Sequence, residues 1–163
     1  MADKHQAHLR LAARLRETAA DVERLTGGLD EDGLARRVEP GKWSLKELVC
    51  HLLRVQQVFE GRIDAMLAAE GAALMPYEPD GDAEFDRLAA RPASEARNAF
   101  LDARAKFLTR LEKLSPEQWH RSGRHPEYPH YDVHFAVEYL LHHEGHHLYQ
   151  IYQRRVLLGK IPH

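Results

Sequence analysis

The sequence predicts an all-α fold, a four-helix bundle with a long crossover between its second and third helices. Apolar residues recur at steps of three and four along four stretches of about 20 residues or more, which is the period of an amphipathic helix. No stretch alternates apolar and polar residues as a half-buried strand does. One connection is much longer than a simple turn, as in bundles that contain a crossover. The length of 163 residues suits a single domain over residues 1–163.

The first two helices are expected over residues 5–25 and 45–69. A Gly-Gly pair follows the first of them and is typical of a helix end. Ser44 and Glu47 have the spacing of a capping box, in which each side chain bonds to the backbone N–H of the other residue. Trp43 directly precedes this cap, where its ring can pack against the entry of the helix.

The last two helices are expected over residues 93–114 and 132–158. Residues 70–92 contain several glycines, prolines and acidic residues, so we expect an irregular crossover there. Ser115 and Pro116 predict a short helical turn after the third helix, because proline is favoured at the first helical position. The segment that leads into the fourth helix is expected to be a loop.

Composition and charge exclude several classes of protein. The chain has 23 Lys and Arg against 25 Asp and Glu, and these are mixed along the sequence, so no basic nucleic-acid-binding surface is predicted. The N-terminus has no apolar signal segment, and no apolar run approaches the roughly 18 residues of a membrane span. The single Cys50 excludes an internal disulfide and suits a reducing compartment. We therefore expect a cytoplasmic protein with a small-molecule substrate, and with neither nucleic acid nor membrane as partner.

Four histidines lie close together on the fourth predicted helix. Residues four apart on a helix lie one above the other, so two imidazoles at this spacing can bind one metal ion together. Two overlapping pairs have the spacing, His142 with His146 and His143 with His147. A pair of this kind indicates a metal site only if another helix supplies a further ligand.

A helical wheel selects the histidines that face the core. On the second helix, His51 lies on the same face as Leu48 and Val55. On the fourth helix, His143 and His147 lie on the more aliphatic side. Burial of an imidazole costs free energy unless its nitrogens are satisfied. The preferred metal ligands are therefore His51, His143 and His147.

Two segments of the chain resemble the signature segments of the DinB/YfiT-like metalloprotein superfamily. The first covers residues 41–47 and is followed by His51, and the second covers residues 143–151. The resemblance implies a four-helix bundle, often dimeric, whose divalent ion is held by one histidine of the second helix and two of the last. Carried over to this sequence, those ligands are His51, His143 and His147.

The resemblance also implies candidate activities. The superfamily includes thiol-dependent S-transferases and isomerases, and Arg54 stands where many members carry an acidic residue. Three neutral imidazoles leave the ion an open position, as in catalytic zinc sites. Such an ion lowers the pKa of bound water or deprotonates a coordinated thiol. We expect a homodimeric metal-dependent enzyme, either a hydrolase or an S-transferase with a low-molecular-weight thiol as co-substrate, with zinc or nickel as the ion.

Two alternative interpretations use the same residues. The run from His143 to His147 also reads as the HExxH signature of zinc peptidases, in which Glu144 would be the general base. Such enzymes need a further ligand downstream, and no acidic residue follows Glu144. The other alternative is a non-catalytic dimeric protein that binds a metal in a stress response. An open coordination position facing a pocket would favour the enzyme.

Other side chains are expected near the site or at its rim. Gln150, Tyr139 and Glu144 are candidates for supporting or substrate contacts, and for Tyr139 we prefer a core position. Cys50 is expected to be a small buried residue rather than a nucleophile. Solvated positions, with a possible contact to substrate, are expected for the histidines that lead into the fourth helix: His120, His125, His130 and His134.

Overall fold

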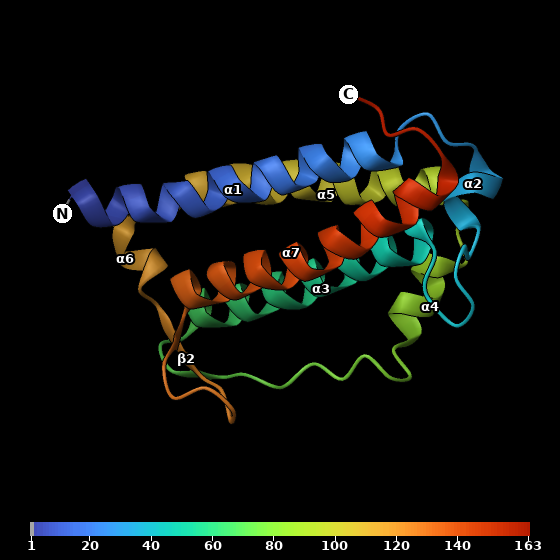
Figure 1. Ribbon diagram of the computed structural model, residues 1–163. Coiled ribbons are helices and arrows are strands. Elements are labelled where there is room, and N and C mark those ends of the chain that lie inside the picture. Colours follow the sequence, from blue (N-terminus) through green and yellow to red (C-terminus); the bar gives the residue numbers. More distant parts are fainter. Residues whose placement is uncertain (1) are drawn as a thin grey trace.

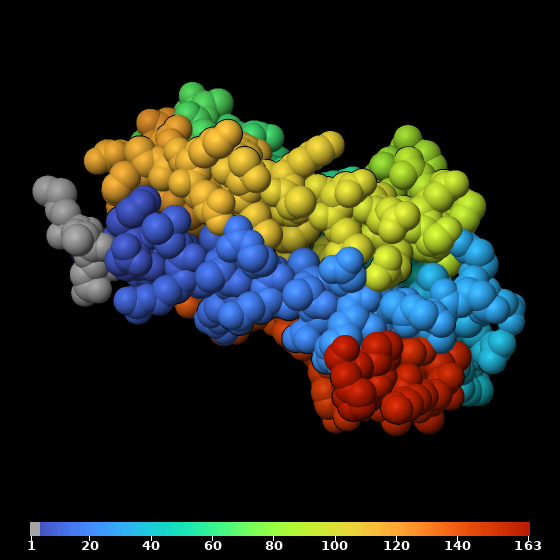
Figure 2. Space-filling model, turned by 90° about the horizontal axis from the view of Figure 1, so that it is seen from above, coloured from blue at the N-terminus to red at the C-terminus, as the bar shows by residue number. Residues whose placement is uncertain are grey.

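The computed structural model describes residues 2–163, with side chains from Lys4 onward. Figure 1 shows its long helices in two layers, with α1 and α5 in one and α7 and α3 in the other. Each of them packs on two neighbours, and α1 and α5 lie side by side when seen from above (Figure 2). The predicted four-helix bundle is thus confirmed. Its helices are α1 (Ala2–Thr26), α3 (Leu45–Ala68), α5 (Ala93–Glu112) and α7 (Val133–Leu158).

The predicted long crossover connects α3 to α5. These two helices run in the same direction, so the connection has to return along the bundle (Figure 1). It contains the two-residue strand β1 (Ala72–Ala73) and the helix α4 (Ala83–Ala89). The Asp82 side chain caps α4 by accepting a hydrogen bond from the N–H of Glu84 at 3.1 Å. The expectation that the crossover has no regular element was therefore wrong, because one capping residue is enough to begin a short helix.

A small three-stranded sheet ties the crossover to the segment that precedes α7. Strand β1 pairs in parallel with β2 (Ser122–Arg124), which pairs antiparallel with β3 (Tyr131–Asp132). A Cβ atom on Gly123 would lie 2.6 Å from Cδ1 of Leu74, so a larger residue here would force the Leu74 side chain to shift. Strands of two or three residues leave no periodic pattern, which is why the sequence did not predict them.

The predicted helix starts are present. The hydroxyl of Ser44 accepts a hydrogen bond from the N–H of Glu47 at 3.2 Å, and the Glu47 carboxylate accepts one from the N–H of Ser44 at 2.8 Å. Asp132 caps α7 through the N–H of Phe135 at 2.7 Å. Two short helices complete the chain, α2 (Glu31–Ala35) and the predicted turn α6 (Pro116–Trp119).

The interior contains two apolar clusters with polar side chains between them. One cluster includes Leu15, Phe107 and Leu140, and the other includes Val22, Phe100 and Ile151. The polar side chains between the clusters include the fully buried pair Arg104 and Glu144 and the half-buried or buried histidines of α3 and α7. Among the described residues, no helix has the length and apolar character needed to cross a membrane.

Candidate metal centre

Three imidazoles meet between α3 and α7. The Nε2 atom of His143 lies 3.3 Å from Nε2 of His51 and 3.1 Å from Nε2 of His147. His51 comes from α3, and the other two come from successive turns of α7. In the part of the chain that the structure describes, this is the one group of three His, Cys, Asp or Glu side chains whose ligand atoms lie within 4.8 Å of one another.

The geometry of this cluster fits a divalent transition ion. A tetrahedral ion with nitrogen ligands at 2.0–2.1 Å places those nitrogens roughly 3.3 Å apart, close to the separations observed here. Protons alone satisfy the cluster poorly, because a neutral imidazole carries one N–H and the three Nε2 atoms all face one another. An ion in the centre would accept all three lone pairs at once.

Gln150 fixes the tautomer of one ligand. The Nδ1–H of His147 donates to Oε1 of Gln150 at 2.8 Å, which leaves the Nε2 atom of His147 with its lone pair directed at the cluster. Gln150 lies one turn further along α7, so the helix itself sets this contact. The sequence led us to expect a supporting or substrate contact for Gln150, and in the structure its side chain contacts His147.

Burial keeps the three imidazoles neutral. Burial, followed by the neighbouring His147 and His143, lowers the pKa of His51 to about 3. Burial, followed by His147 and His146, lowers the pKa of His143 to about 4. Burial is also the largest cause that lowers the pKa of His147. The cluster is therefore in the ligand form, the neutral imidazole, over the physiological pH range.

Trp43 covers one side of the cluster. Its ring centroid lies 4.9 Å from that of His51 and 5.4 Å from that of Phe85, a residue of α4. Arg154 anchors this segment to the end of α7: its Nε–H donates to the Trp43 carbonyl at 3.2 Å, and its NH1 group bonds to Glu39 at 2.9 Å. The segment that precedes the cap of α3 thus also covers one side of the candidate site.

A cavity of about 450 Å³ opens beside the cluster. His51 and His143 form part of its wall, and Tyr128 and Tyr139 form another part. The crossover covers it, held to α3 where the Nε–H of Arg54 donates to Asp82 at 2.6 Å. A metal at the cluster would therefore face a space of the size that small-molecule ligands occupy.

Tyr139 lies at the edge of this cavity. Its side chain is 38% exposed, and its hydroxyl lies 3.3 Å from that of Tyr128. The expectation that Tyr139 packs in the core was wrong, because the cavity interrupts the core at this turn of α7. A position in contact with substrate, the other possibility considered, agrees with this placement.

Glu144 is directed away from the candidate site. It is completely buried and forms a two-point ion pair with Arg104 of α5, one contact being 3.1 Å. Arg104 also donates to Oε1 of Gln56 at 2.8 Å and to the carbonyl of Leu15 at 3.1 Å. Glu144 thus makes the expected contact between helices. Since its carboxylate is fully engaged, it is not available as the general base that a zinc peptidase needs.

The four histidines from His142 to His147 lie on the two sides of α7 that the helical wheel predicted. His142 and His146 are exposed, whereas His143 and His147 are half-buried and face α3. Cys50 is fully buried, and burial raises the pKa of its thiol to about 11, as expected for a structural cysteine.

The four histidines expected to lead into the fourth helix differ from one another, and His134 lies in the first turn of α7. His120 and His130 are exposed, in agreement with the prediction. His125 is instead 7% exposed and lines the cavity, and His134 is half-buried, with its Nδ1 atom 2.8 Å from that of His8. The expectation of solvated side chains was wrong for these two, because the small sheet and α1 cover them.

Arg62 also lines the cavity and was not predicted as a site residue. A signal for it exists: Arg62 lies eleven residues after His51, and eleven residues make about three helical turns, so both residues share one face of α3. Tyr128 carries no comparable signal, and for His125 a contact with substrate was the alternative to a solvated position. They reach the cavity from an irregular segment whose position depends on the sheet.

Comparisons with known proteins assign the chain to a family. A sequence profile described as the DinB superfamily matches residues 14–151. The chain belongs to the DinB superfamily. YfiT from Bacillus subtilis, described as "a probable metal-dependent hydrolase with an unusual four-helix bundle topology", has a similar structure, with a TM-score of 0.74 and 19% sequence identity. The match covers 89% of this chain and 83% of YfiT, and at this identity it establishes the fold alone. No curated protein matches the chain.

Proposed function

We propose that this DinB superfamily member is a metal-dependent enzyme, with a hydrolase as the preferred reaction class. The proposal depends on one observation: three Nε2 atoms meet at the wall of a cavity of about 450 Å³. That of His143 lies 3.3 Å from that of His51 and 3.1 Å from that of His147. His51, His143 and His147 would hold the ion. Zinc and nickel are the preferred ions because both accept imidazole ligands.

The ion would supply Lewis-acid chemistry to a substrate and a water molecule in the cavity. The protein supplies the rest. Gln150 holds the His147 ring in the tautomer that directs its lone pair inward. Trp43 covers the side of His51 that the cavity does not reach, which reduces the access of bulk water there. Tyr128 and Tyr139 present hydroxyl groups at the edge of the cavity, where they can contact a bound molecule.

Two observations support an enzyme over a non-catalytic metal-binding protein. Within the described residues, no fourth His, Cys, Asp or Glu joins the group of three. The cavity also lies directly against His51 and His143, so an incoming molecule can reach the place where an ion would lie. The hydrolase is preferred because the structurally similar YfiT is described as a probable metal-dependent hydrolase. Thiol transfer stays a prediction from the family resemblance.

The first test is metal content. Elemental analysis of the purified protein is expected to find a single divalent transition ion per chain. A ligand at 1,000 times its dissociation constant stabilises a protein by about 4 kcal/mol, so zinc or nickel added to the apoprotein should raise Tm by several degrees. Absence of the ion together with an unchanged Tm would refute the proposal.

The second test separates an enzyme from a closed metal site. Cobalt-substituted protein is expected to change its visible spectrum when azide is added, because azide enters an open coordination position. A panel of aryl esters should then be hydrolysed by the metal-loaded protein and not by His143→Ala. A separate assay of the metal-loaded protein with glutathione and an alkylating substrate tests S-transfer. A spectrum that azide leaves unchanged would favour the non-catalytic alternative.

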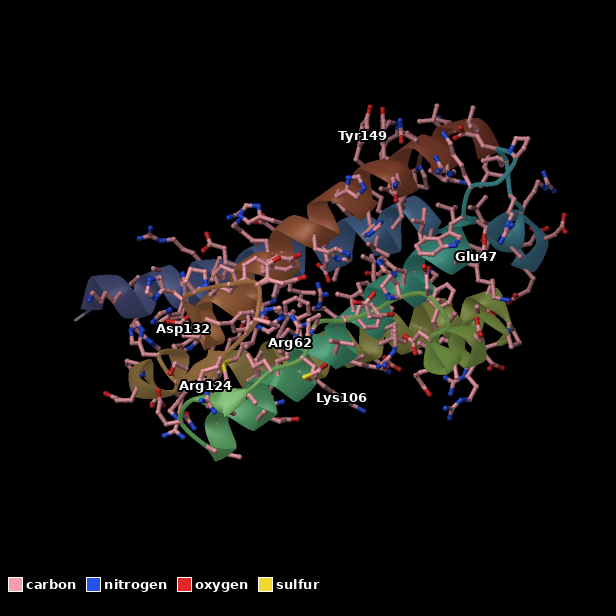
Figure 3. All side chains as sticks on the ribbon, turned by 90° about the horizontal axis from the view of Figure 1, so that it is seen from below. Glu47, Arg62, Lys106, Arg124, Asp132 and Tyr149 are labelled. Atoms are coloured by element: carbon pink, nitrogen blue, oxygen red, sulfur yellow. The ribbon has the colours of Figure 1, made fainter. Side chains whose placement is uncertain are left out.

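The predicted homodimer also remains a proposal. Several large apolar side chains of α7 face solvent, among them Tyr149 at 63% exposure, which points away from the bundle in Figure 3. Tyr152 and Val156 follow at helical spacing and are 46% and 48% exposed. Such a stripe is typical of an interface between subunits. Light scattering should give the mass of a dimer, and Tyr149→Ser with Val156→Ser should shift the mass towards the monomer.

A further inference from the structure

Arg62 is an arginine without a carboxylate partner in the wall of the candidate active site. It lies on the same face of α3 as His51, about three turns along the helix, and it lines the same cavity. Figure 3 shows it beside the extended part of the crossover. Its guanidinium stacks over the ring of Phe59 at 4.8 Å and lies 5.8 Å from the ring centroid of Tyr131. These contacts hold the charged group in place at the cavity.

The hydrogen bonds of Arg62 leave its charge uncompensated. NH1 donates to the hydroxyl of Tyr131 at 3.0 Å, and NH2 donates to the carbonyl of Met75 at 2.8 Å. Its Nε–H is buried and has no partner among the described residues. A guanidinium has five N–H groups, so several remain unused. Arg54 of α3 and Arg104 of α5 differ in this respect, because each is paired with a carboxylate.

Other charged groups of the cavity do not neutralise Arg62. Glu78 and Glu127 line it as well, but both are exposed and neither forms a salt bridge with Arg62. Water screens exposed carboxylates, whereas the half-buried guanidinium is screened less. Burial, and after it Arg62, lowers the pKa of His125, another residue of the cavity wall, and Glu127 raises it by less. Arg62 is thus a cation in the wall of the cavity without a paired carboxylate among the described residues.

We propose that the substrate is a small carboxylate whose anionic end binds Arg62 and whose reacting bond lies at the three-histidine cluster. The proposal rests on the proposed function, since it assigns the second end of the substrate to the metal site. The eleven residues of helix from His51 to Arg62 span about 16 Å, so a single functional group cannot contact both ends of the cavity. The rings of Phe59, Tyr128 and Tyr139 between them suit a flat apolar middle.

The test compares a charged probe with a neutral one of the same shape. Binding of 3-phenylpropanoate and of 3-phenylpropanamide to the zinc-loaded protein is measured by titration calorimetry. The wild type is expected to bind the carboxylate about tenfold more tightly than the amide, which is the size of an effect from one charge-assisted hydrogen-bonded contact. Arg62→Gln should abolish this preference, and Arg62→Lys should retain part of it. Arg10→Gln removes an exposed arginine of α1 and should retain the whole preference.

Three results would overturn the proposal. The first is equal binding of the two probes by the wild type. The second is a preference that persists in Arg62→Gln together with a changed cobalt spectrum, because the carboxylate would then bind the ion itself. The third is a preference lost equally in Arg10→Gln. Zinc affinity is measured for each variant: if the wild type binds no zinc, the proposed function fails, whereas normal zinc binding without a probe preference defeats the substrate assignment alone.

Discussion

Helix α7 contributes to two groups of histidines that differ in a decisive way. In the candidate metal centre, His51, His143 and His147 bring three Nε2 atoms together. In a second group at the far end of the helix, which we call the corner cluster, His8, His120 and His134 lie close without such convergence. There only one contact between ring nitrogens is close, 2.8 Å between Nδ1 of His8 and Nδ1 of His134.

The corner cluster is held in part by aromatic stacking and is partly exposed to solvent. The ring of His8 lies parallel to Trp119 with centroids 4.8 Å apart, and His120 leaves half of its side chain exposed. Burial, followed by His134 and His120, lowers the pKa of His8 to about 4, so low pKa values occur in both clusters. Neither proximity nor a lowered pKa therefore identifies a metal site. What distinguishes the candidate metal centre is that three Nε2 atoms meet beside a cavity.

The largest expected effect is on metal affinity. If it were absent, the two histidine clusters would not differ in the way described above. His51→Ala, His143→Ala and His147→Ala should each weaken zinc binding by orders of magnitude, because two imidazoles do not hold an ion with open positions. His8→Ala and the matched His134→Ala should leave zinc affinity unchanged. Calorimetric titration of the five apoproteins measures this. A strong loss in His134→Ala would mean that the corner cluster also binds metal.

The next effect concerns stability rather than binding. Glu144 follows His143 directly, yet it belongs to the buried ion pair with Arg104. Glu144→Ala leaves the guanidinium buried without a counterion, which should lower the free energy of unfolding by about 3–5 kcal/mol. Arg104→Met with Glu144→Leu should recover most of it. Urea unfolding gives the values, and zinc affinity of the folded double variant should match the wild type. A large loss of zinc affinity would place Glu144 in the metal site after all.

A smaller effect is expected from pH at the corner cluster. The pKa of His8 is about 4 in the folded protein and about 6.5 in the unfolded chain, so between these values the unfolded chain binds more protons. The free energy of unfolding of the apoprotein should therefore fall as pH drops below about 6.5, by at most about 1.4 kcal/mol per pH unit from this group. His8→Gln should show a shallower fall. Identical slopes for both proteins would contradict the placement of His8.

The smallest effect is expected for the exposed histidines of α7. His142→Ala and His146→Ala should keep zinc affinity and change the free energy of unfolding by no more than about 1 kcal/mol, since both side chains face solvent. Thermal unfolding with and without zinc measures both quantities. Zinc affinity that falls here and not in His143→Ala would reverse the assignment of the two overlapping pairs.

The sequence by itself determined the long helices and the three histidines that meet. Helical periodicity is a local property, so the wheel placed His51, His143 and His147 on inward faces before any packing was known. The same logic extends to Arg62, which shares the face of His51. The capping signals at Ser44 and Asp132 are equally local, and the helices begin where those residues predict.

Only the tertiary structure decided which polar groups meet across elements. Glu144 pairs with a residue 40 positions away, and the contact between His8 and His134 spans 126 positions. The cavity exists because a short sheet and one ion pair, between Arg54 and Asp82, hold the crossover against α3. No pattern along the chain encodes such contacts, since their free energy depends on which side chains the folded bundle brings together, and that is set by packing rather than by the helical period.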